Sequence, residues 1–407
     1  MKDGLAGSRP QLVDSPYAWL RLGVALVLAT IGSVGMWSYV VFLPAVQADF
    51  GIARAAATFP YTMGMVGFAA GNALLGRLAD RYGIIAPILL SIACLGVGYV
   101  GAGLSSNMAM LSLAHVLIGL GAAASFGPMI ADISHWFLKR RGIAVAIAAS
   151  GNYFAGAIWP PVIQHFTSTA GWRPTHIGVG LFCVVAMLPF SLMFRQRTVM
   201  LDTPGEGAGF RAPNLGISQN ALFALLCIAG VGCCVAMAMP QVHIVAYCGD
   251  LGYGVARGAE MLSIMLIGGI FSRIASGFIA DKVGGVMTML IGSFMQAVAL
   301  LLYFLFDGLS SLYLISLLFG LFQGGIVPSY AIIVREYFPP KEAGARVGIV
   351  IMATVFGMAL GGWMSGWIFD MTGSYRIAFL NGLAWNLLNL AIAFWLLRAG
   401  RPRPAMA

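Results

Sequence analysis

One arginine lies inside a stretch of sequence that is otherwise apolar. Arg273 precedes Asp281 by eight residues, which at 1.5 Å per residue places it roughly 12 Å into a helix. A cation at mid-bilayer costs at least ~2.5–3.5 kcal/mol, so such a residue usually faces an aqueous cavity. A guanidinium pairs with a carboxylate through two parallel hydrogen bonds. We therefore expect Arg273 to bind an anionic ligand; an ion pair with an acid of another helix is the alternative.

Three titratable side chains in apolar stretches are candidates for carrying a proton. His243 is the first, because the unperturbed histidine pKa of about 6.5 allows switching near physiological pH. It could instead donate a hydrogen bond to the bound anion, or be a buried neutral histidine satisfied by a neighbour. His115 lies in a segment rich in Gly and Ala, where packing is the alternative. Asp132 could carry a proton or form a gate with Arg140 or Arg141.

Further polar and aromatic side chains lie at similar depth in the apolar stretches. Polar side chains within membrane spans tend to face the interior of the helix bundle, whereas aromatic residues near span ends often form an interfacial belt. We predict that the remaining ligand-binding side chains come from this set: Tyr39, Tyr61, Ser125, Asn152, Tyr153, Gln323 and Tyr330.

A short motif occurs twice with a fixed offset of 201 positions. GRLADRYG at 76–83 returns as GFIADKVG at 277–284, and Gly119 and Phe137 correspond to Gly320 and Phe338. A repeat at constant register predicts two similar halves, and related halves of a membrane protein usually enclose a site at their interface. The arginine has no charged counterpart, because Asn72 occupies its position in the first half.

Composition identifies the elements that must position these residues. Hydrophobic residues make up 60% of the 407 and charged residues 9%, against about 45–50% and about 25% in soluble domains. The chain is therefore predicted to be an all-α membrane protein with twelve transmembrane helices. The predicted spans are 19–43, 56–78, 84–104, 107–133, 142–166, 174–194, 219–247, 257–280, 284–305, 310–333, 345–369 and 376–397.

The longest polar gap divides the chain into an N-terminal half at 1–195, a linker at 196–218 and a C-terminal half at 219–407. Of the 23 Lys and Arg residues, Arg273 lies within a span, and only Arg54, Arg173, Arg257 and Arg376 fall on the side opposite the termini. The positive-inside rule then places both termini and the linker in the cytoplasm. It also accounts for the net charge of +9 without nucleic-acid binding.

The duplicated motif and the twelve spans resemble the major facilitator superfamily, whose signature G-x-L-A-D-x-x-G lies between helices 2 and 3. The resemblance covers essentially the whole chain and implies a fold of two pseudo-symmetric six-helix halves. It also implies that Asp80, Arg81, Asp281 and Lys282 gate the cytoplasmic side. A tight charged turn that only fixes topology is the alternative.

Arg273, followed at four-residue intervals by Gly277 and Asp281, resembles the monocarboxylate transporter branch, including bacterial oxalate/formate-type relatives. That branch carries its carboxylate-binding arginine here. Further similarities are DSPYAW at 14–19, WFLKRRG at 136–142 with SGN at 150–152, and GWR at 171–173. Departures are Trp37 where animal members carry a lysine and Gly269 where they carry an acid. Thr354 or a neighbour replaces a second cation of oxalate-type members, so one buried cation fits a monoanion better than a dianion.

The resemblance implies a secondary transporter of a small monocarboxylate, with proton symport preferred, in a bacterial inner membrane and functional as a monomer. Antiport of anions and efflux of drugs or metabolites are the alternatives within the same fold. No nucleophile–base pair, metal-ligand cluster or phosphate-binding loop is found in the spans, so neither an enzyme nor a cofactor is expected. The expected partners are a carboxylate, protons and lipid.

Overall fold

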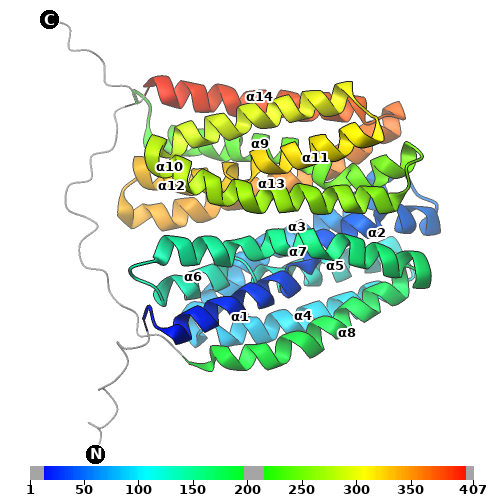
Figure 1. Cartoon of the computed structure of the whole chain (residues 1–407), viewed down its shortest axis with the longest axis horizontal. Helices are drawn as coiled ribbons and strands as arrows, with labels where there is room; N and C mark the ends of the chain where they lie inside the picture. The colour runs from blue at the N-terminus through cyan, green and yellow to red at the C-terminus, as the bar shows by residue number, and fades with distance from the viewer. Residues whose placement is uncertain (1–12, 197–214, 400–407) are drawn as a thin grey trace, which may run out of the picture. The chain divides into compact units, whose positions relative to one another are not determined.

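The computed structural model describes residues 13–196 and 215–399, and these residues form helices joined by short turns, with no strand among them (Figure 1). The side chains of residues 340 and 341 are not described. The predicted all-α class is confirmed. The first eight helices are α1 (Pro16–Gly32), α2 (Val34–Phe50), α3 (Arg54–Tyr82), α4 (Ile85–Gly103), α5 (Met108–Ala123), α6 (Gly127–His135), α7 (Arg141–Ala170) and α8 (Trp172–Ser191), followed by a 3₁₀ turn at Leu192–Arg195.

The remaining helices are α9 (Gln219–Asp250), α10 (Val255–Leu305), α11 (Leu309–Gln323), α12 (Ile326–Tyr337), α13 (Pro340–Thr372) and α14 (Arg376–Ala399). Ten helical stretches of the described chain are long and apolar enough to cross a membrane. One of them, α10, contains two helices, because Gly284 breaks it with φ 81° and ψ 169°. The less apolar α3 is 29 residues long. With α3 added and α10 counted as two, the helices account for all twelve predicted spans.

The chain forms two compact units. Among the described residues, the first comprises 13–52 and 59–196, and the second comprises 53–58 and 215–399. In the first unit α4 and α8 lie side by side, and in the second α9 packs on α13 and α10 on α11 (Figure 1). The first turn of α3 thus belongs to the second unit and the rest of α3 to the first. The predicted boundaries at 195 and 219 stay a prediction, because the predicted linker lies almost entirely outside the described residues.

The helix crossings repeat with the same offset of 201 as the sequence. A Cβ atom on Gly119 of α5 would lie 1.9 Å from the carbonyl oxygen of Gly64 in α3, and one on Gly320 of α11 would lie 1.8 Å from that of Met265 in α10. No side chain fits at either contact. The turn glycines Gly83 and Gly284 also share a conformation, with φ of 82° and 81°, which favours glycine. Each unit therefore contains the same close crossing and the same tight turn.

Three predicted spans are interrupted rather than continuous. The α1–α2 break falls at Ser33, the α5–α6 break at residues 124–126 and the α11–α12 break at residues 324–325. The last two are again about 201 residues apart. At each of these two breaks a side chain of the neighbouring helix accepts a backbone N–H: Asn72 Oδ1 from Gly127 at 3.2 Å, and Ser272 Oγ from Gly324 at 3.1 Å. These tertiary hydrogen bonds replace intrahelical ones, so hydrophobic pattern alone does not reveal the breaks.

Candidate functional site

Arg273 lies on α10 directly beside the α11–α12 break. A Cβ atom on Gly324 would lie 2.7 Å from Gly269 O and 2.8 Å from Arg273 N, and one on Gly325 would lie 2.3 Å from Ser276 Cβ. The absence of side chains at the break lets its backbone approach α10 at the level of Arg273. The arginine side chain is partly buried. The structure thus positions Arg273 by glycine packing next to an interrupted helix.

A pair of buried amides joins the same break to α9. Gln323 ends α11 and has no exposed surface, and its Oε1 accepts a hydrogen bond of 2.8 Å from Gln241 Nε2. Gln241 lies two positions before His243 on α9 and was not among the predicted binding residues. Gln323, predicted as a ligand contact, is therefore adjacent in sequence to the glycines that pack against α10 beside Arg273. Its role in binding stays a prediction.

His243 is fully buried and hydrogen bonded at both ring nitrogens. Its Nε2 lies 2.8 Å from the carbonyl oxygen of Gly362, and its Nδ1 lies 2.9 Å from the hydroxyl of Tyr375. A carbonyl oxygen can only accept, so Nε2 carries the proton. In the neutral ring Nδ1 then accepts from Tyr375. Of the alternatives for His243, the structure shows a buried histidine satisfied by its neighbours; a proton role is compatible with this geometry and stays a prediction.

The hydroxyl of Tyr375 connects His243 to an ion pair that sequence analysis missed. Arg54 Nη1 donates to Tyr375 Oη at 2.6 Å, and the Arg54 guanidinium donates two bonds of 3.0 Å to the Asp250 carboxylate. Asp370 accepts from the backbone N–H groups of Arg54 and Ala55 at 2.7 and 2.8 Å. We call Arg54, His243, Asp250, Asp370 and Tyr375 the Arg54 cluster. All five belong to the second unit.

The repeat could have exposed this cluster. Asp49 at the end of α2 and Asp250 at the end of α9 are 201 positions apart, and each pairs with an arginine, Arg173 and Arg54 respectively. Sequence analysis counted both arginines only as topology charges. Arg54 is instead 6% exposed and its guanidinium lies 4.5 Å from the ring centroid of Phe369. Acids at equivalent positions of the two halves thus each bind an arginine, a pattern that the repeat alone could have indicated.

Tyr330 is held in the apolar core of the second unit. It lies on α12 with no exposed surface, and its hydroxyl donates to Asn389 Oδ1 on α14 at 2.8 Å. Asn389 in turn donates to Ser293 Oγ at 2.7 Å. The hydrogen bond joins two helices within the core, whereas the predicted binding role of Tyr330 stays untested.

The predicted residues of the first unit lie on α2, α3, α5 and α7 and in the α5–α6 break, and all but the half-buried Asn152 are buried. Tyr39 makes an edge contact with His115 at 4.6 Å between ring centroids, and Asn152 Oδ1 accepts from Trp37 Nε1 at 2.9 Å. Ser125 lies in the α5–α6 break, against Gly32 at the end of α1. Tyr61 and Tyr153 are 4% and 6% exposed. Whether these side chains touch a ligand stays a prediction.

A second buried histidine accompanies His115. The ring of His176 on α8 lies 5.7 Å from that of His115 and stacks on Phe42 at 3.8 Å. The Nδ1 atoms of His115 and His176 lie 2.9 and 2.8 Å from the carbonyl oxygens of Leu111 and Trp172. Both therefore carry the proton on Nδ1, the opposite tautomer from His243. Sequence analysis missed His176 because it lies next to the GWR motif at a span end, whereas the candidate polar residues were taken from deeper in the spans.

Asp132 is bonded to an arginine that sequence analysis did not name. Arg21, which is fully buried in α1, donates from Nε and Nη2 to Asp132 Oδ2 at 3.1 and 2.8 Å. The guanidinium lies between the rings of Trp136 and Phe194, 4.4 and 4.3 Å from their centroids. Arg141 is the first residue of α7, Arg140 precedes it, and both are exposed. Asp132 thus forms an ion pair with Arg21 in the first unit, and its proton or gating role stays a prediction.

Replacing Arg21 with alanine should lower the stability of the fold by about 3–5 kcal/mol, because Asp132 would stay buried without its cation. The control is Arg257→Ala, since Arg257 and Glu260 form an exposed pair with side chains 55% and 43% exposed. Thermal unfolding in detergent should show a large drop for Arg21→Ala and none for the control. Equal melting temperatures for the two variants would contradict the buried ion pair.

Two motifs that sequence analysis quoted separately meet in the structure. Asp14 Oδ2 accepts from the backbone N–H groups of Leu138 and Lys139 at 3.3 and 3.1 Å. Aromatic pairs join the same segments, with Tyr17 against Trp136 at 5.4 Å and Trp19 against Phe137 at 5.0 Å. The DSPYAW motif therefore fastens the start of α1 to the WFLKRRG turn before α7.

The four predicted gating residues lie at the two repeated turns and are all exposed: Asp80, Arg81, Asp281 and Lys282. Beyond the second turn, Glu336 Oε1 accepts from Gly285 N at 3.2 Å. The gating role stays a prediction, as does that of Arg140 and Arg141. Among residues 13–196 and 215–399, no group of three His, Cys, Asp or Glu residues could hold a metal ion.

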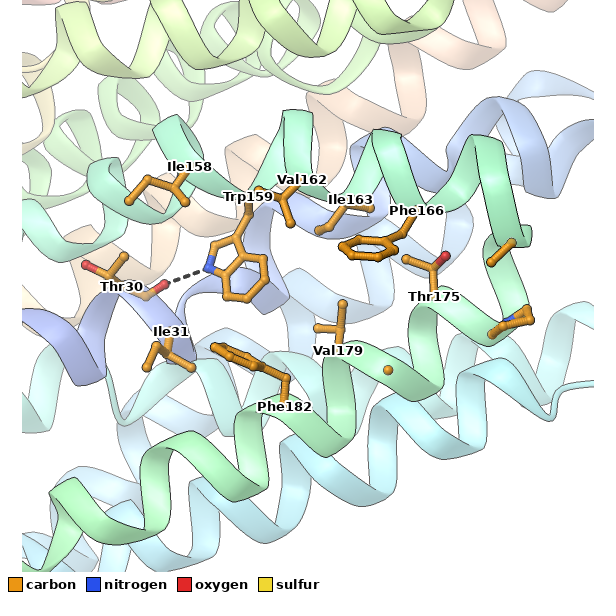
Figure 2. A pocket seen from close by; sticks show the side chains of 13 residues that line it. Thr30, Ile31, Ile158, Trp159, Val162, Ile163, Phe166, Thr175, Val179 and Phe182 are labelled. Carbon is orange, nitrogen blue, oxygen red and sulfur yellow. Dashed lines mark hydrogen bonds between the residues drawn. The ribbon is translucent and has the colours of Figure 1, made fainter.

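A groove of about 580 Å³ in the first unit does not contain the predicted residues. Figure 2 shows Ile158, Val162 and Phe166 of α7 facing Phe182 and Val179 of α8 across it. Among the lining residues the Trp159 indole donates to Thr30 O at 2.9 Å (Figure 2). Besides this indole N–H, the only polar side-chain groups of its lining are the hydroxyls of Thr30 and Thr175, which bond to the carbonyl oxygens of Leu26 and Gly171. The groove therefore lacks the charge that an anion requires.

Comparison with known proteins decides the family. The family model described as Major Facilitator Superfamily matches residues 25–316 and 261–406. The chain belongs to the major facilitator superfamily. It is 24% identical over 364 residues to monocarboxylate transporter 13 of Bos taurus, covering 88% of this chain and 82% of the relative. It is 25% identical over 316 residues to the sialic acid transporter NanX of Escherichia coli, covering 75% and 76%.

Solved structures of the superfamily share this fold. A bacterial homologue of the human lysosomal transporter Spinster, in an inward-facing and occupied conformation, superposes with a TM-score of 0.72 at 15% identity, covering 96% of this chain and all of that structure. The nucleoside transporter NupG superposes with a TM-score of 0.72 at 14% identity, covering 93% and 99%. The predicted fold class and superfamily are confirmed.

Proposed function

We propose that this superfamily member is a secondary active transporter of small monocarboxylates, working by alternating access and coupled to protons as a symporter. The observation that carries the proposal is the position of Arg273, a partly buried cation in a membrane-spanning helix beside the α11–α12 break. A charge held at that depth is expensive, so a functional role is the default. Guanidinium selects carboxylate through charge and bidentate geometry.

The interrupted helices support a ligand near Arg273. Breaks in corresponding helices of the two halves are a recurrent feature of transporter binding sites, because backbone groups freed from the helix line a cavity. Here the α5–α6 and α11–α12 breaks correspond at the repeat offset. The neutral amides Gln323 and Gln241 lie at the second break. One cation with neutral polar neighbours suits a monoanion.

The names of the relatives point to the same class of substrate. Monocarboxylate transporter 13 and the sialic acid transporter NanX are both named for acids. For this chain we propose only the class of substrate, carboxylic acids, and no particular acid. The proposal places both termini in the cytoplasm of a bacterial inner membrane, as the Lys and Arg distribution favours, and takes the monomer as the functional unit.

Uptake into proteoliposomes tests the proposal. Purified protein should accumulate a radiolabelled monocarboxylate against its gradient when the outside is more acidic, and accumulation should collapse when a protonophore removes the pH difference. Counterflow separates the alternatives. An antiporter would need an internal anion, and an efflux pump would extrude drugs or metabolites instead. Carboxylate uptake that needs an internal anion and ignores the pH gradient would overturn proton symport.

Replacing His243 with glutamine should flatten the pH dependence of uptake. Glutamine can donate to Gly362 O and accept from Tyr375, so it preserves the two contacts of His243 without titrating. We expect wild-type uptake to change severalfold between about pH 4.5 and 7.5, a range wide enough to include protonation of a buried histidine, and the variant to change little. A pH profile in His243→Gln identical to that of the wild type would remove His243 as the proton carrier.

A further inference from the structure

The Arg54 cluster is an ordered chain of hydrogen bonds with one direction. Arg54 donates to Tyr375, Tyr375 donates to His243, and His243 donates to Gly362 O. Each group satisfies the next, so the chain is complete only while the imidazole is neutral and protonated on Nε2. Chains polarised in one direction strengthen each of their bonds. The protonation state of His243 is thereby tied to the contacts of Arg54.

We propose that Tyr375 is a positioning residue of the transport cycle: it couples protonation of His243 to release of the first turn of α3 from Asp250 and Asp370. The proposal rests on the proposed proton-coupled function and adds to it the device through which the proton acts. His243 is buried, whereas the Asp250 side chain is 34% exposed. The cluster therefore runs from the end of α9 to a histidine with no direct access to water.

Protonation of His243 reverses one hydrogen bond. Nδ1 of the imidazolium can only donate, so the Tyr375 hydroxyl oxygen would face two cationic donors, His243 and Arg54. Its own proton would have to turn to another acceptor. Two positive charges on one hydroxyl repel each other strongly where the surroundings are poor in water. Arg54 then loses the bond to Tyr375 that now measures 2.6 Å, and the hold on the start of α3 weakens.

Other charged groups near the cluster do not replace this coupling. Besides its own members, the cluster is faced by Tyr247 of α9, whose ring lies 5.5 Å from that of Tyr375, and Arg376 beside Tyr375 pairs with Asp307 at 3.2 Å. Asp370 is committed to the N–H groups of Arg54 and Ala55. Asp250 accepts both bonds from Arg54. Tyr375 is the one described side chain that hydrogen bonds to both His243 and Arg54.

The close fit of α13 adds a second contact that release must break. A Cβ atom on Gly366 would lie 3.1 Å from Ala55 N and 3.1 Å from Thr58 Oγ1. The first turn of α3 is therefore packed against α13 as well as hydrogen bonded to Asp370. Because α3 continues into the first unit, loosening this turn frees the start of a helix that both units share. By reciprocity, release must also raise the proton affinity of His243.

Hydrogen exchange of the full-length protein measures the release without any substrate. The reporter is the peptide covering 53–60, whose amides at Arg54 and Ala55 are bonded to Asp370. After correction for intrinsic exchange, we expect protection in the wild type to fall about tenfold from pH ~7.5 to pH ~4.5, within the ~5–150-fold range usual for coupled sites. Unchanged protection over this range would overturn the proposal.

Two variants separate coupling from mere structure. Tyr375→Phe keeps the ring contacts with Phe369 and Tyr247 at 4.6 and 5.5 Å but removes the hydroxyl. In this variant the hydrogen-exchange protection of peptide 53–60 should no longer depend on pH. His243→Gln should stay protected at both pH values, which tests the proposal even if the phenylalanine variant folds poorly. A wild-type pH response in either variant would contradict it. Arg273→Ala should keep the pH-dependent exchange of peptide 53–60. A failure of carboxylate binding can therefore be told apart from a failure of this coupling.

Discussion

Replacing Arg273 with alanine should lower the efficiency of monocarboxylate uptake by at least about 30-fold. Removing one partner of a buried charge pair costs ~2–5 kcal/mol, and each 1.4 kcal/mol is about tenfold in affinity. Arg273→Lys should give an intermediate loss, because lysine keeps the charge but not the bidentate fork. The measurement is initial uptake rate against substrate concentration in proteoliposomes with equal amounts of folded protein.

The matched control is Arg335→Ala. Arg335 is an exposed arginine in the last turn of α12, so its loss removes the same charge from the second unit without touching the break beside Arg273. Uptake by this variant should equal that of the wild type. An Arg273→Ala protein that transports as well as Arg335→Ala would show that Arg273 is a structural residue.

Replacing Gly320 with alanine should prevent the second unit from folding stably. The added Cβ would lie 1.8 Å from Met265 O and 2.7 Å from the attached carbon, both backbone atoms that cannot rotate away. The α10–α11 crossing would have to open along its length. We expect a loss greater than the ~1–3 kcal/mol typical of overpacked cores. Gly119→Ala should act in the same way on the first unit, since its Cβ would lie 1.9 Å from Gly64 O.

Gly277 and Gly76 provide the controls for these two variants. They belong to the duplicated motif, and a Cβ atom at either would have no heavy atom within 4 Å. Alanine is the better helix former by ~1 kcal/mol, so Gly277→Ala and Gly76→Ala should fold at least as well as the wild type. Thermal unfolding monitored by size-exclusion chromatography compares all four variants. Equal melting temperatures for Gly320→Ala and Gly277→Ala would contradict the crossing.

The helices, their number and the duplicated turns were predictable because they depend on local pattern. Long apolar stretches determine the spans, and the repeat at 201 positions gave the correspondence between halves that the Gly64–Gly119 and Met265–Gly320 crossings bear out. The φ angles of Gly83 and Gly284 agree within a degree, as expected for a duplicated motif. The superfamily followed from the same features.

The helix breaks and the buried ion pairs were not predictable, because tertiary contacts create them. Asn72 and Ser272 accept N–H groups from helices more than 50 positions away. Arg54 lies just before the predicted span 56–78 and was counted as a loop charge, and Arg21 lies in the first residues of the predicted span 19–43. The structure buries both against acids and aromatic rings. A charged residue near a span end is therefore ambiguous until its partner is known.

The most direct test of the central claim is carboxylate-dependent stabilisation of the purified protein. A ligand that binds only the folded state stabilises it by about 2.7 kcal/mol at 100 times its dissociation constant. Small monocarboxylates should raise the melting temperature of the wild type, and their uncharged amides should not. Arg273→Ala should melt at one temperature with or without the carboxylate. Stabilisation of the Arg273→Ala protein equal to that of the wild type would contradict the assignment of Arg273 as the anion-binding residue.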